Sequence, residues 1–277
     1  MIEALIDAAL PDAHELPAFR CEFAAGRSSD LMVLIPVIDE GERILAQLAR
    51  IRESRLGLDV LLVDGGSSDG STEALRLQSL GVSALLVKTG PGRLSAQLRL
   101  GMACAMSRGY AGVITIDGNG KDDCSGIPAF ASALRAGYDH LQGSRYMPGG
   151  IAENTPLDRE LAVRFLHAPL INAAARFRYT DTTNGFRGYS RRLLLDPRVA
   201  PFRDVFSRYE LHYYLAIRAA RLGLRVLELP VTRAYPPRGR TPTKISPLRG
   251  NLLVLKTLLQ ACLHRFDPPA TDAPGAA

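Results

Sequence analysis

The chain has 277 residues and a mass of 30.0 kDa, enough for one large α/β domain or two small ones. Its formal charge of +6 favours anionic partners but does not choose among nucleic acid, anionic lipid and phosphorylated small molecules. The four cysteines are far apart and form no CxxC pair, which argues against a zinc site and suits a reducing compartment. The sequence contains neither a signal peptide nor an apolar run of roughly 18 to 20 residues. We therefore expect a cytoplasmic protein, either free or peripheral on the inner face of the membrane.

The first half of the chain alternates between apolar runs of strand length and stretches with helical spacing. Residues 1–30 are weakly periodic and are expected to form an N-terminal extension that packs on the domain. The predicted strands are 31–38, 60–63, 84–87 and 113–116, and the predicted helices are 40–56, 72–80 and 94–108. Runs that are apolar on both faces and separated by helices predict a parallel sheet. Ligands bind such sheets at the carboxyl ends of the strands.

The second half is less regular. Strands are predicted at 138–142 and 226–231, and helices at 157–176 and 208–222, around the polar segment 180–187. Residues 233–249 carry five basic residues and no acidic one, and their prolines and glycine predict a mobile loop. Residues 246–266 predict an amphipathic helix, and residues 267–277 predict a disordered tail. The five basic residues are Arg233, Arg238, Arg240, Lys244 and Arg249.

Asp64 follows a predicted strand directly, in the sequence V-D-G-G-S-S-D-G-S. A carboxylate there, followed by glycines that let a ligand approach the backbone, can accept hydrogen bonds from a nucleobase or a ribose. The same residue types also form ordinary turns and helix caps, so the motif alone does not decide between the two. The segment has no G-x-G-x-x-G spacing, which weakens a dinucleotide-binding interpretation.

Asp117 begins the sequence D-G-N-G-K-D-D after the strand predicted at 113–116. Several oxygen-bearing side chains in one short loop can hold a divalent cation against a diphosphate. Acidic residues and glycines also make surface turns. A position at the same edge of the sheet as Asp64 favours a functional site.

Six motifs occur in an order that resembles family-2 glycosyltransferases, particularly the dolichyl- and polyprenyl-phosphate sugar synthases. The resemblance covers about residues 31–250 and implies a GT-A fold, a Rossmann-like, mostly parallel sheet flanked by helices. It implies one domain over 31–245, with a donor half at 31–123 and an acceptor half at 124–245. The motifs are VLIPVIDE (33–40), LLVDGGSSDGS (61–71), GVITIDGN (112–119), QGSRY (142–146), TNGFRGY (183–189) and VLELPV (226–231).

On the donor side, the resemblance implies that the first loop and the aspartate of the second strand hold the nucleobase. The loop at 90–93 matches the family's glycine-basic loop near the donor. The family commonly has a second acidic residue after that strand, where this chain has Gly65. The donor-binding residues so implied are Pro36, Val37, Glu40, Asp64, Gly66, Arg93, Asp117, Gly118, Asn119 and Lys121.

The family's metal motif is usually Asp-x-Asp, often followed by Gln, and the matching positions here are Asp117, Asn119 and Lys121. The resemblance implies Mg²⁺ or Mn²⁺ at Asp117 and Asn119. An asparagine brings no charge, however, and a protonated lysine cannot ligate a metal. Lys121 could instead neutralise the diphosphate directly, and Asp122 and Asp123 could supply ligands in a shifted register.

On the acceptor side, the family places an arginine such as Arg145 against phosphate oxygens, and Arg159 lies at the distance of a second basic residue. We expect Phe186 to be a core residue. The implied catalytic residues are Asp117, Arg145 and Asp181, and the implied acceptor-binding residues are Arg145, Arg159, Thr183, Asn184, Arg187 and Lys244.

The implied reaction is an inverting transfer of a sugar from a nucleotide-sugar donor to a polyprenyl phosphate, a glycan or a small molecule. A lipid phosphate needs no general base, whereas a hydroxyl acceptor would need a carboxylate such as Asp181 or Glu210. Two alternatives stay open: a nucleotidyltransferase that makes a sugar nucleotide, and a degenerate relative that only binds one. The chain lacks aromatic platforms for nucleic acid, so no nucleic-acid partner is expected. Helix 246–266 is compatible with a cover on the sheet, a homodimer contact or a membrane surface.

Overall fold

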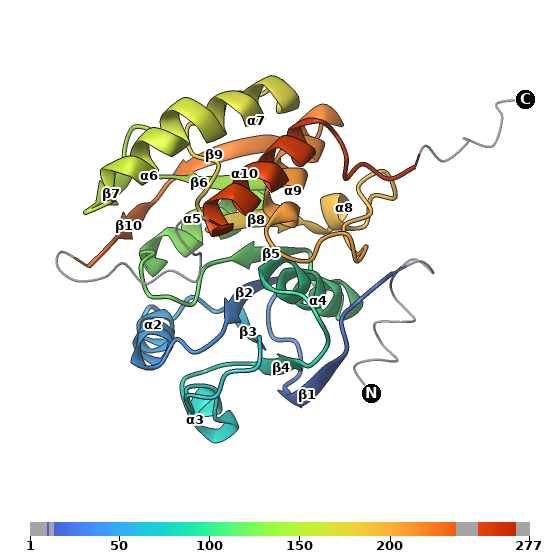
Figure 1. The fold of residues 1–277 in the computed structure, drawn as a ribbon. Coiled ribbons are helices and arrows are strands. Elements are labelled where there is room, and N and C mark those ends of the chain that lie inside the picture. The colour runs from blue at the N-terminus through green and yellow to red at the C-terminus, as the bar shows by residue number, and fades with distance from the viewer. Residues whose placement is uncertain (1–9, 11–13, 237–248, 270–277) are drawn as a thin grey trace, which may run out of the picture.

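The central feature of the computed structural model is an eight-stranded sheet with helices on both faces (Figure 1). The structure describes residue 10, residues 14–236 and residues 249–269. The strand order is β1-β4-β3-β2-β5-β8-β6-β9, and β7 and β10 form a separate pair. The strands are β1 (Phe19–Ala24), β2 (Leu31–Val37), β3 (Asp59–Asp64), β4 (Ala84–Lys88), β5 (Gly112–Thr115), β6 (His140–Ser144), β7 (Ile151–Glu153), β8 (Arg187–Ser190), β9 (Val226–Pro230) and β10 (Thr232–Ala234).

Most of the sheet is parallel, as the alternating pattern predicted. The pairs β2–β3, β3–β4, β2–β5 and β6–β9 are parallel. Strand β8 is antiparallel to both β5 and β6, and β1 is antiparallel to β4. The carboxyl ends of β2, β3 and β5 therefore lie together at one edge, where the topology of an open sheet places a ligand site.

Alternate residues of the central strands face opposite helical layers. On β2, Leu34 faces one core and Ile35 faces the other, and both side chains are fully buried. The Leu34 layer is covered by α4 (Leu94–Ser107), α7 (Ala168–Ala175), α8 (Arg191–Leu194), α9 (Glu210–Arg221) and α10 (Arg249–Cys262). The Ile35 layer is covered by α2 (Glu42–Glu53), α3 (Ala74–Ser79) and α5 (Ile127–Arg135).

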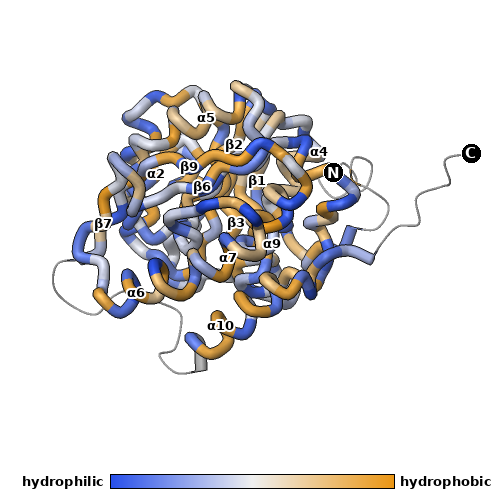
Figure 2. The backbone as a smooth tube through the Cα atoms, turned by 90° about the horizontal axis from the view of Figure 1, so that it is seen from above, coloured by the Kyte–Doolittle hydropathy of each residue, from blue (hydrophilic) through white to orange (hydrophobic). Residues whose placement is uncertain are grey.

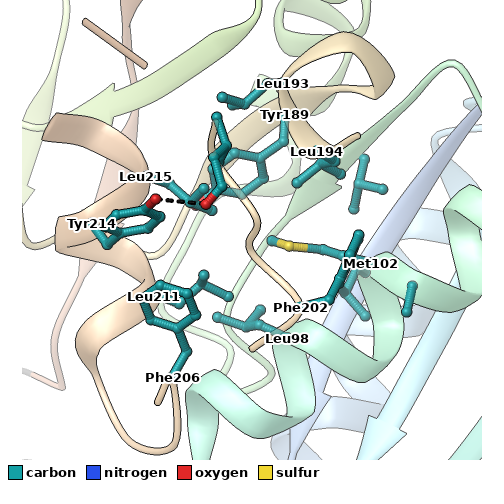
Figure 3. Close-up of a cluster of buried hydrophobic side chains, with 14 of the residues drawn as sticks. Leu98, Met102, Tyr189, Leu193, Leu194, Phe202, Phe206, Leu211, Tyr214 and Leu215 are labelled. Carbon is teal, nitrogen blue, oxygen red and sulfur yellow. Dashed lines mark hydrogen bonds between the residues drawn. The ribbon is translucent and has the colours of Figure 1, made fainter. Parts of the chain in front are cut away.

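Figure 3 shows the core where α4, α8 and α9 meet. Leu98 and Met102 of α4 point toward Leu211 and Leu215 of α9, and all four side chains are buried. The Tyr214 hydroxyl in the same cluster donates to the carbonyl of Val199 at 2.6 Å, so its polar end is satisfied. Burying each of these large side chains contributes about 1.5–3 kcal/mol. This packing fixes the second half of the chain on the sheet.

The predicted elements in residues 31–116 match the observed ones to within a few residues at each end. Strand β1 lies inside the segment expected to be an extension, and β8 lies at the end of the polar segment 180–187. Neither carries a continuous apolar run, because β1 is a largely exposed edge strand and β8 reads Arg-Gly-Tyr-Ser.

The predicted helix 157–176 consists of α6 (Leu157–Ala162), a π-helical turn η2 (Val163–His167) and α7. The helix predicted at 246–266 is α10, and its Leu258 and Ala261 are buried in the core beside α7 and α9, so it covers the fold. No helix in residues 14–236 or 249–269 is long and apolar enough to cross a membrane. The expectations for 237–248 and 270–277, including Arg238, Arg240 and Lys244, lie outside the described residues.

Candidate active site

The loops after β2, β3 and β5 touch one another at the carboxyl edge of the sheet. The amide of Gly65 donates to the carbonyl of Val37 at 2.8 Å. A Cβ on Gly118 would lie 2.6 Å from Cγ1 of Val37, so only glycine allows the β5 loop to approach β2 this closely. Gln47 of α2 fixes the loop after β5 by two hydrogen bonds of 3.0 Å. Its side-chain amide donates to the carbonyl of Asp117, and its side-chain oxygen accepts from the backbone amide of Gly120.

Asp64 organises the loop that follows β3 and is only 2% exposed. Its Oδ1 accepts from the amides of Gly66 (3.1 Å) and Ser67 (2.9 Å), and its Oδ2 accepts from the Thr72 hydroxyl at 3.1 Å. Asp64, Gly66 and Thr72 also line a cavity of about 640 Å³ together with Lys88 at the end of β4. The turn and the ligand-site interpretations of this motif are therefore compatible, because the turn shapes a cavity wall.

At Gly65, where the family commonly has a second acidic residue, the space is occupied by the side chain of Gln97 from α4. The side-chain amide of Gln97 donates to the carbonyls of Val37 and Val63, both at 2.8 Å. A Cβ on Gly65 would lie 3.1 Å from Nε2 of Gln97, so a larger side chain at this position would press on that amide. Gln97 thus joins the ends of β2 and β3 where this chain has a glycine.

Asp117 is held by an arginine from a distant part of the chain. Nη2 of Arg233, on β10, donates to Oδ2 of Asp117 at 3.0 Å, and Nη1 donates to Oδ2 of Asp122 at 2.5 Å. The side chains of Arg233 and Asp122 are 8% and 0% exposed, whereas Asp117 is 24% exposed. Asp117 also lies so close to Gly185 that any Cβ there would overlap its Oδ1.

At both carboxylates burial raises the pKa and Arg233 lowers it, but the balance differs between Asp117 and Asp122. Burial opposes ionisation of Asp117, but the charge and the hydrogen bond of Arg233 outweigh it, so the pKa of Asp117 is lowered. Burial dominates at Asp122 and raises the pKa of that carboxyl, with Arg233 offsetting part of the effect. The pKa of Lys121 is lowered by burial and by the neighbouring charge of Arg233.

Arg145 and Asp181 form a buried ion pair in the second half of the chain. Nε of Arg145 donates to Oδ2 of Asp181 at 2.6 Å and Nη2 donates to Oδ1 at 3.1 Å, and the two side chains are 4% and 0% exposed. Glu228 on β9 supports the pair by accepting the amides of Thr180 (2.9 Å) and Asp181 (3.2 Å). Asp181 is thus engaged with Arg145, an arrangement that suits a positioning residue better than a general base.

Two tyrosines gather five cationic side chains beside this pair. The guanidinium of Arg145 lies 5.0 Å from the ring centre of Tyr146. Nζ of Lys121 lies 5.0 Å from the ring centre of Tyr235, and the Arg159 guanidinium lies 5.8 Å from it. The remaining two of the five cations are the guanidinium of Arg164, 4.9 Å from the ring centre of Tyr146, and that of Arg233, 5.9 Å from the ring centre of Tyr235. Three of the five also pair with carboxylates: Arg145 with Asp181, Arg164 with Glu160, and Arg233 with Asp117 and Asp122.

The position of Arg187 differs from the expectation that it binds the acceptor. It is 1% exposed, and its guanidinium donates to the carbonyls of Thr182, Asn184 and His212, so it braces the loop before β8 instead of facing an acceptor. Asn184 is also buried, and its Oδ1 accepts the amide of Phe186 at 2.9 Å. The expectation for Phe186 is confirmed, because this fully buried ring stacks on Phe130 at 4.3 Å.

The remaining predicted donor residues differ in exposure. Pro36 and Val37 are buried at the end of β2, and Glu40 forms an ion pair of 2.8 Å with Arg43. Arg93 is exposed at the start of α4. Lys244 lies outside the described residues.

Sequence reasoning missed four residues of the site, namely Arg233 as a partner of Asp117, Tyr235, Gln97 and Glu228. The sequence places Arg233 only among five basic residues of one segment. No local pattern marks it as the partner of Asp117, which lies 116 residues earlier in the chain.

The donor set around Asp117 does not fit a divalent cation as it stands. Oδ2 of Asp117 accepts from Arg233 and, at 3.4 Å, from the amide nitrogen of Asn119. Oδ1 of Asn119 accepts the amide of Lys121 at 3.2 Å, so this oxygen serves its own turn. Within the described part of the chain, no group of three His, Cys, Asp or Glu side chains could hold a metal ion. The prediction of a metal at Asp117 and Asn119 is not supported by this geometry.

Comparison with known proteins gives relatives of one kind, although no family model matches the chain. The undecaprenyl-phosphate mannosyltransferase of Micrococcus luteus is 29% identical over 208 residues, which cover 73% of this chain and 82% of the relative. The polyprenol monophosphomannose synthase of Mycolicibacterium smegmatis is 27% identical over 210 residues, covering 73% and 76%.

A solved structure shares the fold. Glucosyl-3-phosphoglycerate synthase from Mycobacterium tuberculosis, in complex with Mn²⁺, UDP and glucosyl-3-phosphoglycerate, superposes with a TM-score of 0.59 at 18% identity. The match covers 98% of this chain and 86% of that one. The fold and the named relatives thus indicate a glycosyltransferase of the GT-A type. Within that class the chain is similar to the polyprenyl-phosphate sugar synthases of family 2, as its motifs predicted.

Proposed function

We propose that this enzyme transfers a sugar from a nucleoside-diphosphate sugar to the phosphate of a polyprenyl phosphate, with inversion at the anomeric carbon. The observation that carries the proposal is the cluster of Lys121, Arg145, Arg159, Arg164 and Arg233 around Tyr146 and Tyr235. Arg145, Arg164 and Arg233 are already paired with carboxylates, so the remaining N–H groups of this cluster would bind a donor diphosphate and an acceptor phosphate side by side. Relatives named as polyprenyl-phosphate mannosyltransferases support the choice of acceptor.

A phosphate acceptor suits the carboxylates of this site. An acceptor phosphate oxygen attacks the anomeric carbon, and the bond from that carbon to the β-phosphate oxygen breaks with its electron pair going to the nucleoside diphosphate. No proton needs to be removed, so no general base is required. Asp181 is paired with Arg145, and Oε2 of Glu210 accepts the amide of Arg208 at 2.5 Å. No step passes through a metal ion, because the donors around Asp117 do not fit one.

The cavity beside Asp64 suits the nucleoside part of the donor. It lies at the carboxyl ends of β3 and β4, and Lys88 closes one side while its Nζ donates to the carbonyl of Gly90 at 2.7 Å. A volume of about 640 Å³ is within the usual range of small-molecule sites, roughly 300–1,000 Å³. The sugar would then extend toward Asp117 and the cation cluster.

A product assay tests the function. Purified enzyme, a polyprenyl phosphate and UDP-, GDP-, CDP- and dTDP-sugars are incubated in turn, and nucleoside diphosphate and lipid-linked sugar are both quantified. We expect stoichiometric formation of the two products with one donor class. Release of pyrophosphate from a nucleoside triphosphate and a sugar phosphate would show a nucleotidyltransferase instead. Donor binding without any turnover would show a degenerate relative.

A variant separates acceptor from donor binding. Arg159→Met removes a half-buried cation from Tyr235, so the KM for the polyprenyl phosphate should rise by about tenfold, as the loss of one charge-assisted hydrogen bond predicts. The KM for the donor should stay unchanged. Arg192→Met is the matched control, because Arg192 pairs with Asp139, beside the amino end of β6 and away from the site.

An apolar surface next to the cation cluster suits a membrane that carries the lipid acceptor. Leu157, Leu161 and Phe165 on α6 and η2 are 68%, 46% and 75% exposed. Figure 2 shows α6 and α10 along the same side of the molecule, and α10 adds Leu252 and Leu259 at 69% and 42% exposure. Apolar side chains beside basic ones are typical of a surface that rests on anionic lipid.

Vesicle sedimentation tests this surface. We expect the protein to sediment with vesicles of phosphatidylcholine and phosphatidylglycerol, and the double variant Leu157→Ser, Phe165→Ser to stay mostly in the supernatant. Leu75→Ser is the control, because Leu75 is 74% exposed on α3 in the other helical layer. Equal loss of sedimentation in both variants would refute the proposal.

A further inference from the structure

The Arg233 guanidinium occupies the position between two carboxylates at which a metal-binding site would hold its cation. It bridges Asp117 (3.0 Å) and Asp122 (2.5 Å), which come from the loop after β5. The backbone locks it there from both sides. The amide of Asp123 donates to the carbonyl of Thr232 at 3.0 Å, and the amide of Ala234 donates to the carbonyl of Lys121 at 2.9 Å. The guanidinium is therefore fixed by its own strand as well as by its ion pairs.

Arg233 places a positive charge where a metal ion would lie. Its guanidinium pairs with both carboxylates, Asp117 and Asp122, and Lys121 adds a second cationic side chain over the same Tyr235 ring. Arginine stays protonated at all physiological pH values, so a divalent ion that entered would meet a fixed positive charge. To reach Oδ2 of either carboxylate it would also have to displace the Arg233 guanidinium from its ion pair.

The same guanidinium has donors left for a phosphate. An arginine carries five N–H groups, and the bonds to Asp117 and Asp122 use one on each terminal nitrogen. Asp117 is 24% exposed, so this end of the cluster opens to the site while Asp122 closes the other end. Negative charge that develops on the leaving nucleoside diphosphate would thus meet a preorganised cation.

We propose that Arg233, assisted by Lys121, is a built-in counter-cation that replaces the divalent metal ion in this site. The inference rests on the proposed function, and it makes sugar transfer independent of added metal. It also implies that the two aspartates are a latent metal site, closed by the arginine. Removing the guanidinium should open that site, because two neighbouring carboxylates are oxygen ligands that Mn²⁺ accepts.

Mn²⁺ binding, followed by electron paramagnetic resonance and by thermal melting, tests the inference without any donor. Wild-type protein should leave Mn²⁺ free in solution and melt at the same temperature with Mn²⁺ or EDTA. Arg233→Met should melt lower in EDTA, bind Mn²⁺ saturably and recover part of the lost melting temperature. Arg233→Lys, which keeps one charge, should stay insensitive to Mn²⁺. Arg218→Met is the control, because this partly buried arginine pairs with Asp267 away from the site.

Turnover provides the second measurement. Wild-type activity should be equal in EDTA and in Mn²⁺, and Arg233→Met should lose about 100-fold in kcat without metal, as for loss of one preorganised donor. Saturable Mn²⁺ binding by the wild type that disappears in Asp117→Asn would overturn the inference, and so would loss of wild-type turnover in EDTA. If no donor and acceptor pair gives turnover, the proposed function fails, and Mn²⁺ binding still decides the role of Arg233.

Discussion

Replacing Asp181 by asparagine is a sharp test of the acceptor half, because it removes one charge from a fully buried pair and keeps the shape. Arg145 is 4% exposed and donates to both carboxylate oxygens of Asp181, at 2.6 and 3.1 Å. In Asp181→Asn the guanidinium stays buried without a counter-charge. Breaking a buried pair by removing one partner costs about 3–5 kcal/mol.

The size of the expected melting shift follows from the chain length. An unfolding entropy of about 2.1 cal/mol/K per residue gives about 0.6 kcal/mol/K for the whole chain, so we expect Asp181→Asn to melt about 5–9 °C lower. Urea unfolding followed by circular dichroism gives the free-energy difference directly. Asp30→Asn is the control, because Asp30 and Arg135 pair while 48% and 51% exposed. An exposed pair is worth at most about 1 kcal/mol.

The effect has a definite pH dependence. Burial disfavours the Asp181 carboxylate, but Arg145 and the amide of Thr183 outweigh burial and lower its pKa in the folded protein. The pair therefore contributes its full stability above the unfolded aspartate pKa of about 3.9, and the contribution disappears as pH falls toward the lower folded pKa. The difference between wild type and Asp181→Asn should shrink in that acid range. A difference at pH 7 no larger than that of Asp30→Asn would refute the reasoning.

Three further predictions concern the donor side and the core. Gly185→Ala should lower kcat about tenfold or more, since its Cβ would displace the Asp117 carboxylate, whereas Gly26→Ala, with no atom near the new Cβ, should be neutral in the same assay. Asp64→Ala should weaken nucleotide binding in calorimetry by about 5- to 150-fold, because unmaking hydrogen bonds to a buried carboxylate costs about 1–3 kcal/mol. Burial raises the pKa of the Cys104 thiol to about 12, so Ellman's reagent at pH 8 should modify Cys104 only after unfolding.

The sequence by itself determined the order of strands and helices in the donor half and the edge at which the site lies. The strands 31–38, 60–63, 84–87 and 113–116 are apolar on both faces, and that pattern has few solutions other than a covered parallel sheet. Asp64 and Asp117 follow such strands directly, so their meeting at one edge follows from the topology. Local patterns sufficed because these features depend on neighbours in the chain.

Only the tertiary structure decided which charges meet. Arg233 reaches Asp117 across 116 residues, through the β6–β9 pair and the short β10 strand, and no local pattern encodes that contact. The resemblance implied acceptor binding for Arg187, but the fold buries this side chain, and three backbone carbonyls make its burial tolerable. The sequence thus predicts a diphosphate site at the sheet edge. The identity of its cation depends on long-range packing, because a buried charge takes whichever partner the fold brings within hydrogen-bonding distance.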